Sequence, residues 1–293
     1  MAADDIDPSA ERALAILRLE IDAIDNALHD LLINRAEIVD RVAAAKKGAG
    51  RRGGAPLFRG GREAQILRRL IGRNRAPLPV DAVVGVWREI ITALTRLQGD
   101  FHIAAYAPAG VWRYADLAAG HFGCREKLHR IPSIAAALTA VARGRVQLAV
   151  LPLPGAEPRA ERGWWRRLGS ANGLTILARL PFIGGSSRGA EGVIVGRQGF
   201  DPSGEDAGYI VVESRKAAGS ARLKSALKAV GLSAIEEKVA RGGKTQYQLV
   251  ETSEWVGPDD PRLHRLAEAL DAKVRSLGGY ARPLAAKKRK YSR

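Results

Sequence analysis

The sequence is poor in cysteine, in aromatic residues and in long apolar runs. One cysteine, Cys124, in 293 residues excludes an internal disulfide framework and any zinc or redox site built on paired cysteines. Aromatic residues make up 5%, so a core has to be mainly aliphatic. No run reaches the roughly 18 apolar residues of a membrane-spanning helix, and residues 1–12 lack the features of a signal or transit peptide. We expect a soluble, cytoplasmic protein with no membrane partner.

Positive charge is what the sequence has in excess. It contains 47 Lys and Arg against 31 Asp and Glu, a formal net charge of +16 at pH 7. At about 100–200 residues per domain, the length predicts two or three domains. An excess of this size indicates an anionic partner, which could be nucleic acid, an acidic membrane surface or a small polyanion. The positions of the Lys and Arg residues in the sequence indicate which of these three kinds of partner is favoured.

One uninterrupted helical pattern fills the N-terminal region. Residues 9–47 contain no Pro or Gly, and Asp7 and Pro8 suit the N-cap and the first helical position. At 1.5 Å per residue such a helix is on the order of 55 Å long, more than one small domain covers, so we expect a homodimer. The apolar residues recur at spacings of three and four, at Leu14, Leu17, Ile21, Ile24, Leu28, Leu31, Ile38 and Val42.

Two shorter helices are predicted next, separated by the glycine- and arginine-rich loop 48–61 and by residues 75–79. The first covers residues 62–74. Together with the long helix they form a predicted all-helical domain over residues 8–99. The inner face of the third helix is predicted at Val83, Trp87, Ile90, Leu94 and Leu97.

The pattern changes after residue 100. Short apolar runs alternate with helical segments over residues 100–199, which predicts an open α/β domain. After a predicted linker at 199–208, residues 207–285 follow the order strand, helix, strand, strand, helix, strand, with the second helix at 261–274 and the last strand at 278–284. That βαββαβ order is ferredoxin-like. Residues 286–293 are a basic tail, and the fold class is multidomain.

Several polar side chains fall on faces where a helical bundle would be apolar. Arg35 follows Leu31 by four residues, and Lys46 lies three turns further along the same face. A buried cation is costly unless an anion meets it, although long side chains can also extend to water or pair with a local carboxylate. Natural bundles place ligand sites in this interior. The candidate residues are Arg18, Arg35, Lys46, Arg62, Glu63 and Gln98.

Residues 10–98 resemble the all-helical, AroQ-type chorismate mutases. The segment LRLEIDAIDNALHDLLINRAEIVDRVAAAK (17–46), the pair Arg62 and Glu63, and WREIITALTRLQ (87–98) are similar to the family's motifs. The resemblance implies that the substrate is chorismate and that no cofactor or metal is needed. Two positions depart from the family pattern, because Arg59 replaces an aspartate and Leu94 replaces a serine.

The same resemblance implies a role for each candidate residue. Arg18, donated by the second chain of a dimer, and Arg35 would hold the two carboxylates of chorismate. Lys46 and Gln98 would donate hydrogen bonds to its ether oxygen. Glu63 would accept one from its hydroxyl, and Arg62 would position the substrate.

The remaining two thirds resemble a prephenate dehydratase followed by an ACT domain. The similarity lies in residues 121–124, 131–153 and 277–284. The dehydratase motifs Pro-Ile-Glu-Asn-Ser and Thr-Arg-Phe are replaced at 152–156 and 190–192, and the span between them is too short for a second lobe. The ACT motifs are replaced at 221–223 and 236–239. We expect a catalytically silent remnant that serves as a scaffold rather than an amino-acid sensor.

Other interpretations stay open from the residues. A bifunctional mutase and dehydratase would need the missing threonine. A nucleic-acid binder could use Arg51, Arg52 and the tail 287–290, but these lack interleaved aromatics that stack on bases, so nucleic acid is disfavoured. His121, Cys124 and His129 have no matching second cluster, so no metal site is predicted.

Overall fold

The computed structural model describes residues 8–48, 56–74, 78–99, 101–123, 128–169, 173–184, 189–215 and 218–284. Contacts divide the chain into two compact units. The first contains helix α1 and residues 94–99, and the second contains the rest of the described chain. No helix within these ranges is long and apolar enough to cross a membrane.

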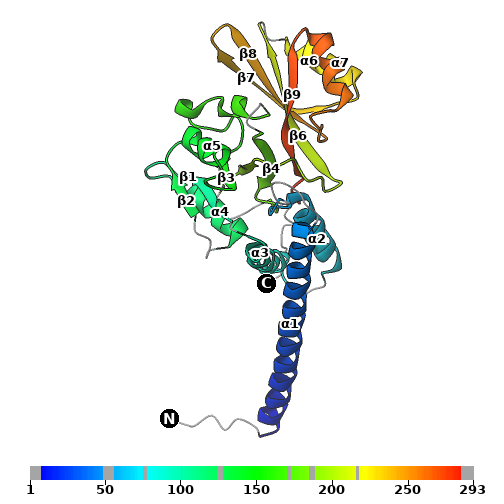
Figure 1. The fold of residues 1–293 in the computed structure, drawn as a ribbon. Helices are drawn as coiled ribbons and strands as arrows, with labels where there is room; N and C mark the ends of the chain where they lie inside the picture. The colour runs from blue at the N-terminus through cyan, green and yellow to red at the C-terminus, as the bar shows by residue number, and fades with distance from the viewer. Residues whose placement is uncertain are drawn as a thin grey trace, which may run out of the picture. The chain divides into compact units, whose positions relative to one another are not determined.

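Helix α1 spans Pro8–Gly48 and confirms the predicted long helix (Figure 1). Its 41 residues correspond to a length of about 60 Å. The apolar stripe is exposed to solvent along its length, with Leu14 at 48%, Leu28 at 53% and Leu31 at 63% relative exposure. A stripe of this kind normally faces another apolar surface. The predicted homodimer stays a prediction.

The two shorter helices are confirmed as α2, Gly60–Arg73, and α3, Val80–Arg96. The inner face of α3 differs from the predicted one. Its buried residues are Val83, Val84, Arg88 and Thr92, so the buried line runs through 84, 88 and 92. Val83 belongs to both faces, but Trp87 and Ile90 are only half-buried. Arg88 is buried instead because it meets an acidic partner, Glu63.

The predicted open α/β domain is confirmed, with one helix on each face of its sheet. The alternate residues Ala104 and Tyr106 of β1 pack with α5, and Ile103 and Ala105 pack with α4, as expected from the two-residue period of a strand. Strands β2, β1 and β3 are parallel, and β5 runs antiparallel to β3 and β4. The elements are β1 Ile103–Tyr106, α4 Arg113–Phe122, β2 Leu128–Ile131, α5 Ile134–Ala142, β3 Leu148–Pro152, β4 Thr175–Leu180 and β5 Gly192–Gly196.

Strand β2 and two 3₁₀ turns were not predicted from the sequence. The turns are η1, Arg159–Glu161, and η2, Trp164–Arg167, and they follow β3. Four-residue β2 lies at the edge of the sheet and is largely exposed. It therefore lacks the continuous apolar run by which the buried strands were recognised.

The C-terminal part has the predicted ferredoxin-like topology. Its strands lie in the order β9-β6-β8-β7, and α6 and α7 cover one face through a common core that includes Leu223, Leu266 and Val250 (Figure 1). The elements are β6 Asp206–Ser214, α6 Ser220–Ala229, β7 Ala234–Gly242, β8 Thr245–Thr252, α7 Pro261–Leu270 and β9 Lys273–Ala281.

Three predicted boundaries in this part were wrong. Helix α7 ends at Leu270 rather than Val274, because Asp271 adopts a left-handed conformation with φ of 50°. Val274 instead pairs with Val212 in the sheet, so β9 starts before residue 278. The predicted linker is also shorter, since β6 begins at Asp206.

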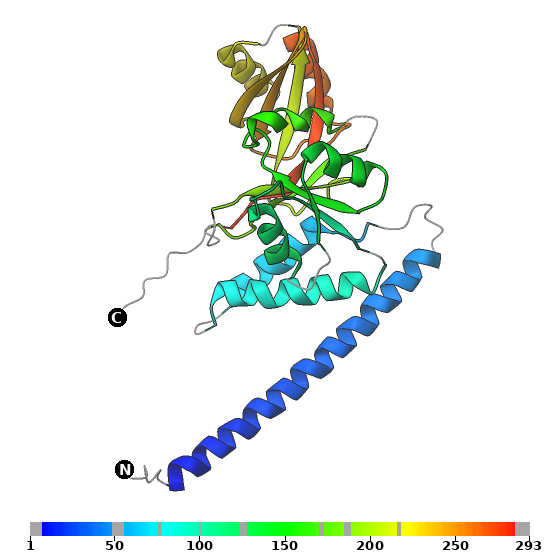
Figure 2. The same cartoon turned by 90° about the vertical axis from the view of Figure 1, so that its left-hand side faces the viewer.

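Strands β4 and β9 join the two sheets into one of nine strands (Figure 2). They pair in parallel where Ile176 meets Gly278. Gly278 has a φ of +107°, and a Cβ atom there would lie 2.2 Å from the Ile176 carbonyl oxygen. Only glycine permits this approach. The predicted domain boundaries at residues 99, 199 and 207 stay predictions.

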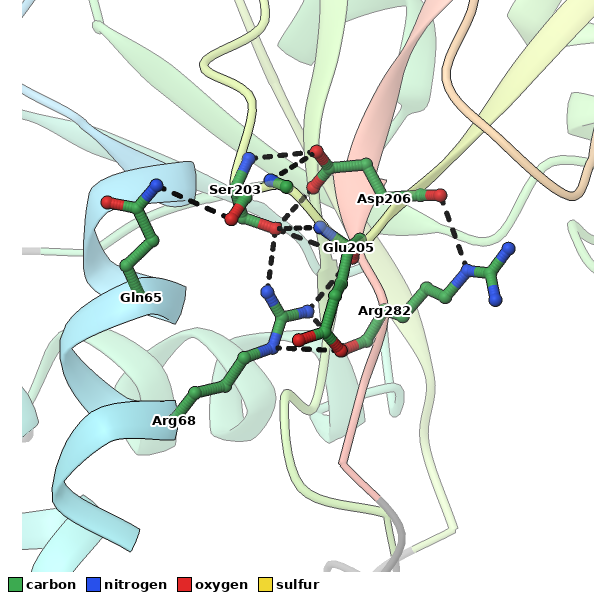
Figure 3. A network of polar contacts seen from close by, with 7 residues as sticks. Gln65, Arg68, Ser203, Glu205, Asp206 and Arg282 are labelled. Carbon is green, nitrogen blue, oxygen red and sulfur yellow. Dashed lines mark hydrogen bonds and ion pairs between the residues drawn. The ribbon is translucent and has the colours of Figure 1, made fainter. Parts of the chain in front are cut away.

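Helix α2 is anchored to the ferredoxin-like part by Arg68 (Figure 3). Its guanidinium donates hydrogen bonds to Ser203 Oγ at 2.8 Å and to the carbonyls of Glu205 at 2.9 Å and Arg282 at 3.1 Å. Gln65, one turn earlier, donates to the Ser203 carbonyl. These contacts fix α2 against the start of β6 and the end of β9.

Candidate active site

Four of the six predicted site residues lie in the first unit. Arg18, Arg35 and Lys46 are in α1, and Gln98 follows the end of α3. Arg18 is exposed, whereas Arg35 and Gln98 are half-buried. Arg35 and Lys46 are eleven residues apart, which places them on one face of α1 and about 16 Å apart along its axis.

Arg62 and Glu63 lie in the second unit, in the first turn of α2. The Asp201 carboxylate accepts a hydrogen bond from the Arg62 backbone amide at 2.9 Å. It also forms an ion pair with the Arg59 guanidinium at 2.9 Å. Arg59, which departs from the family pattern, therefore holds the loop around Asp201 beside the start of α2. Leu94 is the other position that departs from the family pattern. Its backbone carbonyl accepts a hydrogen bond from the Gln98 side-chain amide at 3.4 Å.

Glu63 is part of a buried cluster that joins three helices. Its Oε1 accepts a hydrogen bond from Arg88 Nη1 of α3 at 2.6 Å and lies 3.7 Å from His121 Nε2 of α4. Arg88 also contacts His121 directly. All three side chains are buried, at 8% exposure or less. The open space beside them is only about 20 Å³, which is room for about one water.

Burial controls the electrostatics of this cluster. Desolvation raises the pKa of Glu63, and the charge of Arg88 opposes that shift. Desolvation and then the same charge of Arg88 lower the pKa of His121 well below its usual value, so the imidazole is neutral at pH 7. A neutral imidazole can accept a hydrogen bond from Arg88.

Arg88 and His121 are the residues that sequence reasoning missed. Arg88 lies four residues after Val84 and four before Thr92, which is helical spacing. A search for polar residues on a second helical line would have found it. His121 could not be assigned in this way, because its partners are 33 and 58 residues away in the chain.

The remaining candidate positions are dispersed. Glu191, at the position of the replaced dehydratase motif, pairs with Arg179 at 3.2 Å. His129 lies beside His102, with ring centroids 5.6 Å apart, while Cys124 lies outside the described residues. In the described ranges no three His, Cys, Asp or Glu side chains form a group that could hold a metal. Arg51, Arg52 and the tail 287–290 also lie outside them.

The fold defines a class of protein: N-terminal helices followed by an α/β part and a ferredoxin-like part that share one nine-stranded sheet. Residues 17–99 match the family model of chorismate mutase type II. The match contains all six predicted site residues. By sequence, this part of the chain is a chorismate mutase type II domain.

Two curated relatives match a longer stretch. A bifunctional chorismate mutase/prephenate dehydratase of Pseudomonas aeruginosa is 33% identical over 141 residues, and one of Stutzerimonas stutzeri is 28% identical over 141 residues. Each alignment covers 48% of this chain and 38% of the relative. The chain thus matches well under half the length of either relative.

Among solved structures, the prephenate dehydratase of Streptococcus mutans is similar with a TM-score of 0.47 and 11% sequence identity. The alignment covers 63% of this chain and 100% of that one.

Proposed function

We propose that this protein is a chorismate mutase, which rearranges chorismate to prephenate in the biosynthesis of phenylalanine and tyrosine. The observation that carries the proposal is the match of residues 17–99 to chorismate mutase type II. The placement of Arg35 and Lys46 on one face of α1 supports it, because chorismate is a dianion.

The reaction is a unimolecular pericyclic shift that breaks an ether bond, so it requires neither a nucleophile nor a redox cofactor. The protein has to hold the compact conformer of the substrate and stabilise charge on the ether oxygen. In this proposal Arg35, with Arg18 of a second copy, binds the carboxylates through paired hydrogen bonds. Lys46 and Gln98 donate to the ether oxygen, while Arg62 positions the substrate.

Glu63 can take part in this mechanism only if its side chain becomes accessible to the substrate. Its proposed role is to accept a hydrogen bond from the substrate hydroxyl. In the arrangement described, Glu63 is paired with Arg88 in a space of about 20 Å³. Contact with substrate therefore requires this cluster to open.

The proposed assembly is a homodimer in the cytoplasm, formed through the N-terminal helices. The exposed apolar stripe of α1 supports it, since a stripe of this length on a helix is stabilised by burial against a second helix. A dimer would also bring Arg18 of one copy to the site of the other.

We propose no dehydratase activity for the C-terminal region. Residues 152–156 are Pro-Leu-Pro-Gly-Ala and residues 190–192 are Ala-Glu-Gly, so neither position supplies a side-chain hydroxyl or guanidinium. This region then serves as a scaffold. Because the curated relatives carry both activities in their names, the product of the reaction is the discriminating measurement.

The direct test follows the loss of chorismate by absorbance in wild type and in Lys46→Ala. We expect Lys46→Ala to lower kcat at least about 100-fold, as removal of one donor to a developing negative charge does, while the dimer persists. Lys47→Ala is the matched control, because the neighbouring residue carries the same charge about 100° around the helix. Near-wild-type turnover in Lys46→Ala contradicts the assignment.

Product analysis tests the silent C-terminal region. We expect prephenate to accumulate at neutral pH, with phenylpyruvate appearing only after the sample is acidified. Enzyme-dependent formation of phenylpyruvate at neutral pH would show that the region retains dehydratase activity.

A further inference from the structure

A cavity of about 340 Å³ lies apart from the mutase residues, between the α/β part and the ferredoxin-like part. Its walls are Ala135 and Leu138 of α5, residues 160–167 of the two 3₁₀ turns, and Tyr247 of β8. The volume lies at the lower end of the roughly 300–1,000 Å³ typical of small-molecule pockets. All of the lining belongs to the second unit.

The lining is strongly cationic. It contains three arginines, Arg162, Arg166 and Arg167, and one carboxylate, Glu161. Glu161 is already engaged, because its Oε1 accepts the Ile134 amide at the start of α5 at 3.1 Å. The surplus of guanidinium groups indicates an anionic ligand.

Arg166 is held in place without meeting a negative charge. Its Nε donates to the Gly163 carbonyl at 2.9 Å, its Nη1 donates to the Arg241 carbonyl at 3.3 Å, and it stacks on Tyr247 with 5.2 Å to the ring centroid. No carboxylate within the described residues forms an ion pair with it. Its Nη2 group can therefore bind an anion without breaking an existing ion pair.

The neighbouring backbone is shaped around this guanidinium. A Cβ atom on Gly163 would lie 2.8 Å from Arg166 Nε, and one on Gly242 would lie 2.4 Å from Nη1. The turn itself is fastened by Arg275 of β9, which donates to the Arg166 carbonyl at 2.8 Å. A cation that is fixed before the ligand arrives loses little conformational entropy on binding.

The rest of the lining is mainly apolar. Leu138, Ala135 and the Tyr247 ring form the apolar side. Trp164, 5% exposed, also lines the cavity.

We propose that this cavity binds a small carboxylate with an apolar body, with the carboxylate on Arg166 and Arg162 and the apolar body against Leu138 and Tyr247. The proposal is independent of the mutase assignment, because it rests on residues 134–275 alone. It gives the C-terminal region a ligand site that neither the dehydratase nor the ACT motifs describe.

Calorimetric titration of the full chain with phenylacetate tests the proposal, with phenylacetamide as the neutral ligand of the same shape. We expect phenylacetate to bind with a Kd on the order of 1–10 mM, as a ligand of ten heavy atoms does. Phenylacetamide should bind at least about tenfold more weakly because it lacks the charge. Equal binding of the two ligands overturns the proposed role of Arg166.

Substitutions in the lining test whether phenylacetate binds in this cavity. Arg166→Gln should weaken phenylacetate binding at least about tenfold, and Gly242→Ala should do the same by displacing the guanidinium while the charge is retained. Arg159→Gln, which removes an arginine of η1 outside the lining, should leave it unchanged. Wild-type affinity in a folded Gly242→Ala protein contradicts the proposal, as does inorganic phosphate that binds as tightly as phenylacetate. No chorismate is used, so the outcome is separate from that of the mutase test.

Discussion

Glu63, Arg88 and His121 show how a single side chain can be recognised in the sequence while its partners are not. The family pattern identifies Glu63 as a candidate site residue. Its bond to Arg88 at 2.6 Å and its proximity to His121 arise only when α2, α3 and α4 pack together. Burial shifts the pKa of both Glu63 and His121, and the charge of Arg88 opposes that shift at Glu63 and adds to it at His121.

His121 predicts a pH dependence of stability. Its pKa in the folded protein is lowered, so below pH of about 6.5 the unfolded chain binds a proton that the folded one does not. Stability should therefore fall as the pH drops below that value, by up to about 1.4 kcal/mol per pH unit. The raised pKa of Glu63 acts in the opposite direction, reducing stability as the pH rises above about 4.5.

The measurement is the urea unfolding curve of wild type and His121→Gln between pH 5 and 7. We expect the stability of His121→Gln to depend less on pH, since the amide does not titrate. His264→Gln is the control, because the His264 side chain is 80% exposed on α7. If His121→Gln keeps the wild-type pH dependence, another group is responsible.

At the scale of elements, α1 and α3 illustrate the strength and the limit of helical periodicity. The exposed apolar stripe of α1 follows the predicted positions. On α3 the same reasoning selected the wrong line, because the buried face includes Arg88 and Thr92. Periodicity of apolar residues locates a buried face only when that face is apolar.

The α1 stripe predicts that a charge at its centre prevents dimer formation. We expect Leu28→Glu to be monomeric by light scattering, because a dimer would have to bury an unpaired carboxylate. Asn26→Glu, which adds the same charge about 160° around the helix, should remain dimeric. A dimeric Leu28→Glu protein would mean that α1 is not the interface.

At the scale of the whole molecule, the net charge of +16 has two parts. Arg18, Arg35, Lys46 and Arg62 belong to the proposed substrate site, and the cavity beside Arg166 uses a few more. The combined field of all the cations attracts anions, including a dianionic substrate, from a distance.

This field predicts that catalysis depends on salt. We expect kcat/KM for chorismate to fall when KCl is raised from about 20 to about 500 mM, because the Debye length shortens from roughly 20 Å to 4 Å. The value of kcat should change little, since the field acts on encounter. Sucrose at the same osmolality is the control. A kcat/KM that is independent of KCl would mean that the surplus charge plays no part in substrate binding.

Local order was largely decided by the sequence. The spacing of apolar residues was sufficient to predict the three N-terminal helices and the βαββαβ order of the C-terminal part. The motifs around Arg35, Lys46 and Glu63 were sufficient to identify the resemblance to the mutase family. These features depend on residues within a few turns or one strand of each other, so a linear pattern records them. The ends of α7 and β9 were mispredicted, because the left-handed Asp271 interrupts an otherwise helical pattern.

Only the tertiary structure decided which distant groups meet. The pairing of β4 with β9, the anchoring of α2 by Arg68, the burial of Arg88 against Glu63 and the cavity beside Arg166 all join segments that are 25 or more residues apart. No periodicity records such contacts, because their free energy depends on how whole elements pack. For the same reason, the sequence identified the cations, and the packed structure determined which of them have a carboxylate partner.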